Sequence, residues 1–165
     1  MKSVEQHVLD TADKCPAHSY VADHGTEIED GFEQVTLAGH QITVSEDLTD
    51  DEYALVEKAI TLTQPRNKQC FTNSLNLWQY NHRFKYTEGY AAISRPFDLV
   101  IEHAWSMLDG EKIIDFTPDF ESYYGVIITS EEVMAQNTGT ETSPGGIICR
   151  RENRDFLQDR GYFRH

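Results

Sequence analysis

The stretch IEHAWSMLDGEKIIDF, residues 101–116, has the pattern of two apolar strands joined by a turn at Asp109-Gly110. Two ionisable side chains, His103 and Asp115, lie within these apolar runs. A charge that is taken out of water is stable only when it has a partner. The hairpin therefore predicts either that His103 and Asp115 form a structural pair or that they serve a third residue elsewhere in the chain.

The length of the turn decides whether these two side chains can meet. With a two-residue turn, His103 would oppose Phe116, and Asp115 would lie on the reverse face of the hairpin. With a three-residue loop, residues 108–110, His103 would oppose Asp115 directly. We predict the three-residue loop, in which a type I turn is followed by a left-handed glycine, Gly110, at positive φ.

The rest of the chain predicts an α+β protein, because a helix is followed by consecutive, antiparallel strands. Thr49 and Glu52 form a capping-box pattern that opens a helix ending before Pro65. We expect a short helix or mobile arm over 3–13, loop over 17–31 and flexible loop over 138–146. The expected strands are 32–38, 41–45, 84–93, 99–107, 111–116 and 123–129, and the further helices are 70–80 and 130–136.

No linker or internal repeat divides the 165 residues, and we expect one domain. Its core is expected over about 50–137, with an N-terminal elaboration over 1–49 and a C-terminal tail over 138–165. The arginines of that tail are interleaved with acids, which favours a solvated segment of mixed charge.

A candidate nucleophile, Cys70, lies at the predicted start of the helix over 70–80. The unpaired N–H groups and the dipole at a helix N-terminus favour a thiolate over a thiol. Arg66 and Lys68 add positive charge nearby in the sequence. The alternative is a buried cysteine that packs as a small hydrophobe. A base would distinguish the two, and His103, with Asp115 to orient it, is the candidate base.

The composition excludes several classes of function. The net charge of −14 argues against direct binding to nucleic acid or to an anionic membrane. The first residues lack the apolar core of a secretory signal, and no segment is long enough to span a bilayer, so we expect a cytoplasmic protein. The three cysteines are widely spaced without a CxxC pair, which predicts no disulfide framework and no zinc site. We expect no metal and no cofactor.

Four segments together resemble the core of the transglutaminase-like superfamily, which has a papain-like catalytic arrangement. These are Cys70 at a helix start, YTEGYA at 86–91, His103-Ala104-Trp105, and Asp115-Phe116-Thr117. The family pattern has a helix-borne Cys, a strand ending near Gly-Tyr, a His-Ala-Trp strand and an Asp-Pro-Thr strand, in the same order. The resemblance covers about residues 64–130. Two positions depart from the pattern, Phe71 for the usual Trp and Phe116 for the usual Pro.

The resemblance implies a nucleophile-bearing helix packed on an antiparallel sheet, and a Cys70, His103, Asp115 triad. It also implies an oxyanion donor at Gln64, six positions before Cys70, beside the Cys70 backbone N–H. Asn67 and Gln69 compete with Gln64 for that role. Trp105 and Tyr90 could shape a substrate groove, although core packing is the commoner role of such residues.

The implied activity is acyl transfer through a Cys70 thioester, with a protein, a peptide or a small amide as substrate. Water as acceptor gives a protease or amidase, an amine gives a cross-linking transglutaminase, and we expect hydrolysis because nothing marks an amine site. One alternative is an acidic, non-catalytic binding or inhibitory protein, such as a DNA mimic or decoy, that keeps the fold. Another is an acyltransferase that uses a thioester donor. The oligomeric state is not indicated.

Overall fold

The computed structural model describes residues 4–13, 15–29, 31–93, 99–117, 120–138 and 146–160. Helices and strands alternate in groups along the chain, as expected for an α+β protein. Their order is α1(Val4–Thr11), α2(Pro16–His24), β1(Thr26–Ile28), β2(Phe32–Leu37), β3(His40–Ser45), α3(Asp50–Thr63), α4(Cys70–Tyr80), β4(Phe84–Ile93), β5(Leu99–Leu108), β6(Lys112–Asp115), β7(Ser122–Ile127), α5(Glu131–Asn137) and α6(Arg151–Arg160).

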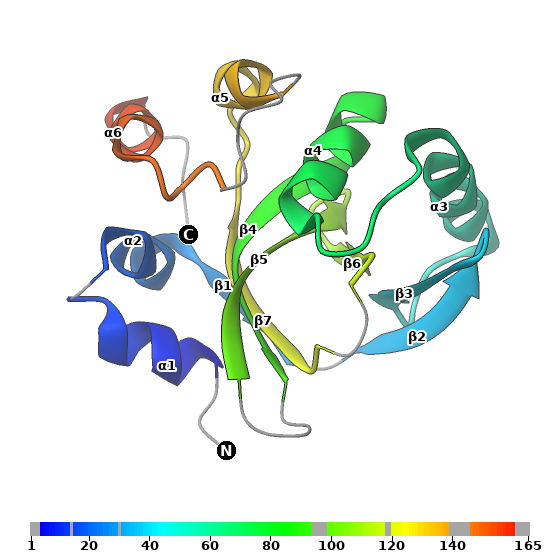
Figure 1. Ribbon diagram of the computed structural model, residues 1–165, viewed down its shortest axis with the longest axis horizontal. Helices are drawn as coiled ribbons and strands as arrows, with labels where there is room; N and C mark the ends of the chain where they lie inside the picture. The colour runs from blue at the N-terminus through cyan, green and yellow to red at the C-terminus, as the bar shows by residue number, and fades with distance from the viewer. Residues whose placement is uncertain are drawn as a thin grey trace.

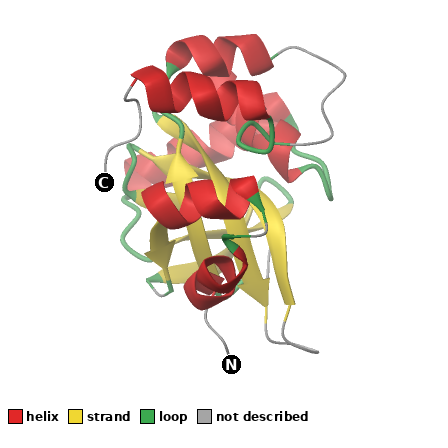
Figure 2. Cartoon of the chain, turned by 90° about the vertical axis from the view of Figure 1, so that its left-hand side faces the viewer, coloured by secondary structure: helices red, strands yellow, loops and turns green. Residues whose placement is uncertain are grey.

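The strands form one antiparallel sheet with the order β1-β7-β4-β5-β6-β3-β2. The sheet is strongly curled, and the helices are ranged along its outer side, from α1 and α2 to α3 (Figure 1). In the view turned by 90°, the N-terminal helices lie in front of the strands (Figure 2). This arrangement confirms the predicted α+β class.

The two faces of the sheet carry different apolar clusters. On the outer face, residues of all the described helices pack on strand side chains such as Tyr86, Ala104 and Leu108. The inner, concave face carries a smaller cluster from the strands and from the segment before β7. Its buried members are Ala91, Trp105, Met107, Ile113, Phe120 and Tyr123. Helices therefore cover one face only, and the aromatic side chains of the other face pack against one another inside the curl.

Helix α3 begins as its capping box predicts. The Thr49 hydroxyl accepts a hydrogen bond from the Glu52 N–H at 3.2 Å, and the Glu52 carboxylate accepts one from the Thr49 N–H at 2.9 Å. The helix ends at Thr63, two residues before Pro65. Helix α4 occupies Cys70–Tyr80, the predicted range. Its apolar side packs on the sheet through Leu77 and Trp78, which are buried.

The turn between β5 and β6 has three residues, as predicted, but they are not the predicted three. Leu108 pairs with Lys112, so the loop is 109–111. Gly110 has a φ of +77°, which confirms its predicted left-handed conformation. Asp109 has a φ of +55°, so the predicted type I turn before the glycine is wrong. Asp109 can adopt this conformation because aspartate is one of the few non-glycine residues that enter it readily.

The register of the hairpin is displaced from the prediction by two residues. Met107 pairs with Ile113, whereas the prediction placed Met107 opposite Glu111. Because the side-chain period of a strand is two, this displacement leaves every side chain on its predicted face. His103 and Asp115 therefore still share a face, although they meet diagonally and not directly across the ladder.

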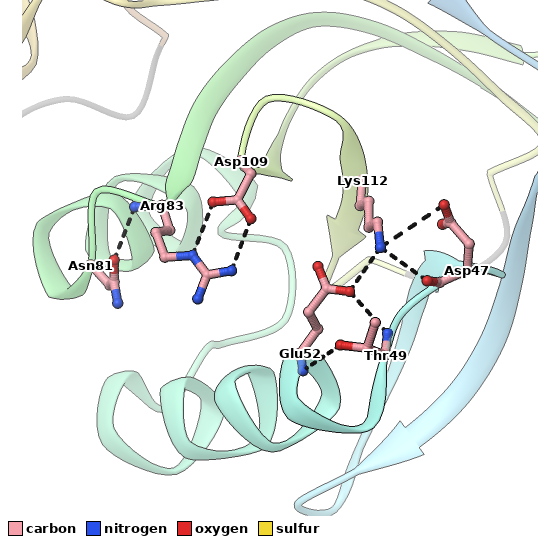
Figure 3. Close-up of polar contacts among 7 residues, drawn as sticks. All are labelled: Asp47, Thr49, Glu52, Asn81, Arg83, Asp109 and Lys112. Carbon is pink, nitrogen blue, oxygen red and sulfur yellow. Dashed lines mark hydrogen bonds and ion pairs between the residues drawn. The ribbon is translucent and has the colours of Figure 1, made fainter.

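Polar contacts anchor the turn and explain the register (Figure 3). The guanidinium of Arg83 donates two hydrogen bonds to Asp109, at 2.9 and 2.8 Å, and the Asp109 N–H donates to the Arg83 carbonyl at 2.7 Å. The ammonium of Lys112 donates to Glu52 at 2.8 Å and to the Asp47 carbonyl at 3.0 Å. The hairpin is thus tied to the segment after α4 and to the start of α3, and these contacts are not visible in the local sequence.

Two segments differ from the sequence prediction. Residues 17–31 were expected to form a loop, but they contain most of α2 and the whole of β1, with Tyr20 and Val21 buried. The arginine-rich C-terminal segment was expected to be solvated, but α6 buries Leu157 in the outer-face cluster. In both segments charged residues dilute the apolar pattern, and the buried side chains belong to a cluster that gathers residues from distant parts of the chain. The predicted loop over 138–146 lies largely outside the described residues.

Two glycines let β4 and β7 approach closely beside the hairpin. Gly89 and Gly125 pair with each other, and Gly89 also pairs with His103. A Cβ atom on Gly125 would lie 2.4 Å from Cη2 of Trp105 and 2.9 Å from the carbonyl oxygen of Glu88. Real Cβ contacts of this length essentially do not occur. The ring of Trp105 therefore requires glycine at position 125.

We predict that Gly125→Ala destabilises the protein by about 1–3 kcal/mol, because the new methyl group overpacks a closed aromatic cluster. The free energy of unfolding from denaturant titration measures the effect. Thr36→Ala, at an exposed position of β2, is the control and should change stability by no more than about 0.5 kcal/mol. Equal stability of Gly125→Ala and the wild type would contradict the close packing of Trp105 on β7.

Candidate functional site

His103 and Asp115 form a buried, hydrogen-bonded pair on the concave face of the sheet. Nε2 of His103 lies 2.9 Å from Oδ2 of Asp115, and the two residues are only 1% and 2% exposed. His103 comes from the middle of β5 and Asp115 from the end of β6. The predicted pair is therefore present. It can form because the odd number of loop residues places both side chains on the same face of the hairpin.

Aromatic rings surround the imidazole. The ring of Trp105 stacks on His103 with a centroid distance of 5.9 Å and an interplanar angle of 22°. Phe120 lies at 4.5 Å and Tyr123 at 6.3 Å. These contacts, together with the bond to Asp115, restrict the imidazole to one orientation. Its second nitrogen, Nδ1, is then the one left for another partner.

That partner is Cys70, the first residue of α4. Cys70 lies close enough to His103 to raise the pKa of the imidazole. Cys70 can reach the histidine because β6 pairs with β5 only over Ser106–Leu108, so the edge of β5 beside His103 is not covered by β6. Helix α4 packs on β4 and β5, on the helix-covered side of the sheet (Figure 1). Cys70 is partly exposed, whereas His103 is buried.

The charges around His103 favour its protonated form. Burial is the largest single influence and lowers the pKa of His103, but the charge of Asp115, the hydrogen bond to Asp115 and the contact with Cys70 together raise it to about 9. The imidazole is therefore mainly an imidazolium at neutral pH. This cation is held against the Asp115 carboxylate, with Cys70 on its other side.

The segment before Cys70 is held in place by Asn73, one turn further along α4. The side chain of Asn73 accepts a hydrogen bond from the Arg66 N–H at 2.9 Å and donates one to the Arg66 carbonyl at 2.7 Å. Asn73 is 6% exposed. Sequence reasoning missed this residue, although an amide on the buried side of a helix always needs partners. Its two bonds fix the chain just before the thiol.

The three predicted oxyanion candidates are all exposed. Gln64 ends α3 in a left-handed conformation with a φ of 49°, and its N–H donates to the Ile60 carbonyl. Gln69 precedes α4 and accepts the Asn73 N–H through its carbonyl at 2.8 Å. Within the described ranges, no hydrogen bond joins Gln64, Asn67 or Gln69 to Cys70, so their role stays a prediction.

Trp105 and Tyr90 were considered as walls of a substrate groove, and both are buried. Trp105 is 1% exposed and packs against His103 and Tyr123. Tyr90 is 3% exposed and lies on the outer face, where its ring meets the ring of His18 edge to face at 4.3 Å. Trp105 thus packs against the imidazole of His103, and Tyr90 belongs to the core that the helices cover. A contact with substrate stays a prediction for both.

A second buried carboxylate, Glu88, lies near Phe71 on the outer face. It accepts hydrogen bonds from the Tyr86 hydroxyl at 2.7 Å and from the N–H groups of Ile147 and Ile148, each at 2.5 Å. Burial raises the pKa of Glu88 to about 7, although these three donors oppose the rise. Glu88 therefore holds the C-terminal segment onto the sheet beside the residue that follows Cys70.

The described part of the chain brings together no group of three or more His, Cys, Asp or Glu side chains that could hold a metal ion. In the same residues, no helix has the length and apolar character needed to cross a membrane. Comparisons with family models, with curated proteins and with solved structures find no match to this chain.

The raised pKa of His103 predicts a pH dependence of stability. The pKa of His103 is 6.5 in the unfolded chain and about 9 in the folded protein. The stabilisation that comes from this difference is fully present below pH 6.5, and it is lost as the pH rises through about 9. We expect the free energy of unfolding to fall by on the order of 3 kcal/mol between these limits because of His103.

Denaturant titration of the wild type and of Asp115→Asn across this range measures the effect. Asp115→Asn removes the negative charge that raises the pKa of His103, so its stability should vary much less with pH. Because all other titrating groups are common to both proteins, the difference between the two curves isolates the pair. Parallel curves would contradict the buried ion pair.

Proposed function

We propose that this chain is a cysteine-dependent acyl-transfer enzyme of the transglutaminase-like type. The observation that carries the proposal is the convergence of Cys70, His103 and Asp115 from three separate elements, with the sulfur accessible and the imidazole–carboxylate pair buried. The resemblance of the same residues to the transglutaminase-like pattern agrees with the proposal. A structural ion pair would need no thiol at its open end.

In the first step, the thiolate of Cys70 attacks the carbonyl carbon of an amide or ester. A tetrahedral intermediate forms, and its negative oxygen needs hydrogen-bond donors. The N–H groups in the first turn of a helix have no partner within the helix, so the start of α4 offers such donors at the sulfur itself. The imidazolium of His103 gives its proton to the leaving amine, the C–N bond breaks, and a thioester remains on Cys70.

In the second step, neutral His103 takes a proton from the acceptor, which attacks the thioester. The Cys70 sulfur leaves as the thiolate, and His103 is again an imidazolium. Asp115 stabilises that cation in both steps and does not itself carry the proton. Water as acceptor gives hydrolysis of a peptide or amide bond, which we favour, and an amine gives a new amide.

Thiol reactivity separates this proposal from a binding protein. Cys149 is the most exposed of the three thiols, so accessibility alone predicts that it is alkylated first. However, burial and then the charges of Glu88 and Glu102 raise the pKa of Cys149. We expect iodoacetamide near neutral pH to label Cys70 faster than Cys149 or Cys15, as measured by peptide mass spectrometry at early times.

The control variant is His103→Gln. It should slow the labelling of Cys70 by about tenfold or more, because the cation beside the sulfur is lost, and it should leave the labelling of Cys149 unchanged. Fastest labelling at Cys149 in the wild type, with no effect of His103→Gln on Cys70, would favour the acidic binding or inhibitory protein.

Acylation by an activated ester tests the chemistry directly. We expect p-nitrophenyl acetate to place one acetyl group transiently on Cys70, visible by intact-protein mass spectrometry. Cys70→Ser should abolish this adduct, and Asp115→Asn should slow its formation by about 100-fold or more. Adding a primary amine then distinguishes the acceptors, since an acetylated amine would identify a transferase and acetate alone a hydrolase. An adduct that forms equally in Cys70→Ser would exclude Cys70 as the nucleophile.

A further inference from the structure

The carboxylate of Asp115 receives a third hydrogen bond that the triad does not require. The hydroxyl of Tyr123 donates to Oδ2 of Asp115 at 2.8 Å. This is the same oxygen that contacts Nε2 of His103. The other oxygen, Oδ1, accepts the N–H of Thr117 at 3.0 Å. Three donors therefore fix the carboxylate, and one of them shares the oxygen that holds the imidazole.

Tyr123 reaches Asp115 across the concave face. It lies on β7, and the strands β4 and β5 separate β7 from β6 in the sheet. The residue is fully buried, and its ring lies 5.0 Å from that of Trp105 and 6.0 Å from that of Phe120. Because both rings also contact His103, Tyr123 belongs to the packed wall of the imidazole and cannot swing away from the carboxylate.

The hydroxyl of Tyr123 has only one proton, and further groups set where that proton goes. Thr43 lies close enough to Tyr123 to lower the pKa of its hydroxyl, and the amide of Gln34 donates to Oγ1 of Thr43 at 2.6 Å. Because Oγ1 of Thr43 accepts from Gln34, its own proton remains available on the side of Tyr123, and the Tyr123 hydroxyl donates to Asp115.

The hydroxyl also stays protonated. Burial and the charge of Asp115 raise the pKa of Tyr123 well above its ordinary value. It is therefore a hydrogen-bond donor over the whole pH range in which a thiolate–imidazolium pair works. A tyrosine whose only role was to fill the aromatic cluster would not need its hydroxyl aimed at this carboxylate.

We infer that Tyr123 is a positioning residue of the acyl-transfer site, acting through Asp115. Its hydroxyl holds Oδ2 in line with Nε2 of His103, so that Nδ1 stays directed at the Cys70 sulfur. This role rests on the proposed function. The hydrogen bond from Tyr123 adds a residue to the Cys70, His103 and Asp115 triad. The sequence does not reveal it, because Tyr123 and Tyr124 are adjacent tyrosines of one strand and nothing in the sequence distinguishes them.

Tyr123→Phe tests the role, because it removes the hydroxyl and keeps the ring. The matched control is Tyr124→Phe, since the hydroxyl of Tyr124 is also on β7 but donates to the Ala22 carbonyl on the outer face. We expect Tyr123→Phe to lower the rate constant for Cys70 acylation by p-nitrophenyl acetate about 10–100-fold, without a matching change in KM. Tyr124→Phe should change neither.

A double mutant shows whether Tyr123 acts through the carboxylate. If it does, Tyr123→Phe should have little further effect on the acylation rate in the Asp115→Asn background, whereas independent effects would multiply. Thr43→Val, which removes the hydroxyl beside Tyr123 and leaves the tyrosine ring in place, should give a smaller loss in the same direction. This variant also keeps the test open if Tyr123→Phe does not fold.

The third measurement does not depend on activity. The proton on Nε2 of His103 should give a slowly exchanging NMR signal in the wild type and in Tyr124→Phe, and in Tyr123→Phe it should be broadened by exchange with water. If the wild type is not acylated, the proposed function fails while this signal still decides the positioning role. Unchanged exchange and unchanged acylation in Tyr123→Phe, or a multiplicative loss in the double mutant, would overturn the inference.

Discussion

The buried contact between His103 and Asp115 is the interaction on which the rest of the site depends. Two groups that carry charge are removed from water here, which costs free energy unless each is paired and hydrogen-bonded. The structure meets this cost with the short bond between the two side chains and with further donors on the carboxylate. Different parts of the fold meet the requirements of this pair. They are the odd number of residues in the hairpin loop, the glycine under Trp105, and the curl of the sheet that brings β7 across to β6.

The division of the sheet into two faces explains how the proposed base can be buried while the proposed nucleophile is partly exposed. Helices cover the outer face, and the concave face is closed by its own aromatic side chains. The imidazole lies on the concave side, whereas Cys70 arrives with α4 from the helix side. Beside His103 the edge of β5 is not paired with β6, since the pairs between these two strands run only from Ser106 to Leu108. The geometry supports a site in which the charged machinery is shielded and the reacting sulfur is not.

Local sequence patterns predicted much of this arrangement, since their physical cause is local. The capping box at Thr49 and the helix that begins at Cys70 follow from interactions within a few residues. The alternation of strands placed His103 and Asp115 on one face, and that conclusion survived a register that was wrong by two residues. The prediction failed for the turn itself and for α2, β1 and α6. The turn is held by Arg83 and Lys112, β1 pairs with the distant β7, and α2 and α6 contribute side chains to a core cluster built from distant segments.

The sequence by itself determined which chemical groups are available and which face of each element they occupy. Both properties follow from residue identity and from the periods of helix and strand. The tertiary structure alone decided which of those groups touch. It selected Tyr123 and not Tyr124 for the carboxylate, placed Asn73 against the chain before the thiol, and gave Glu88 to the C-terminal segment. Contacts of this kind depend on sheet curl and on the docking of distant segments, neither of which leaves a periodic signal in the chain.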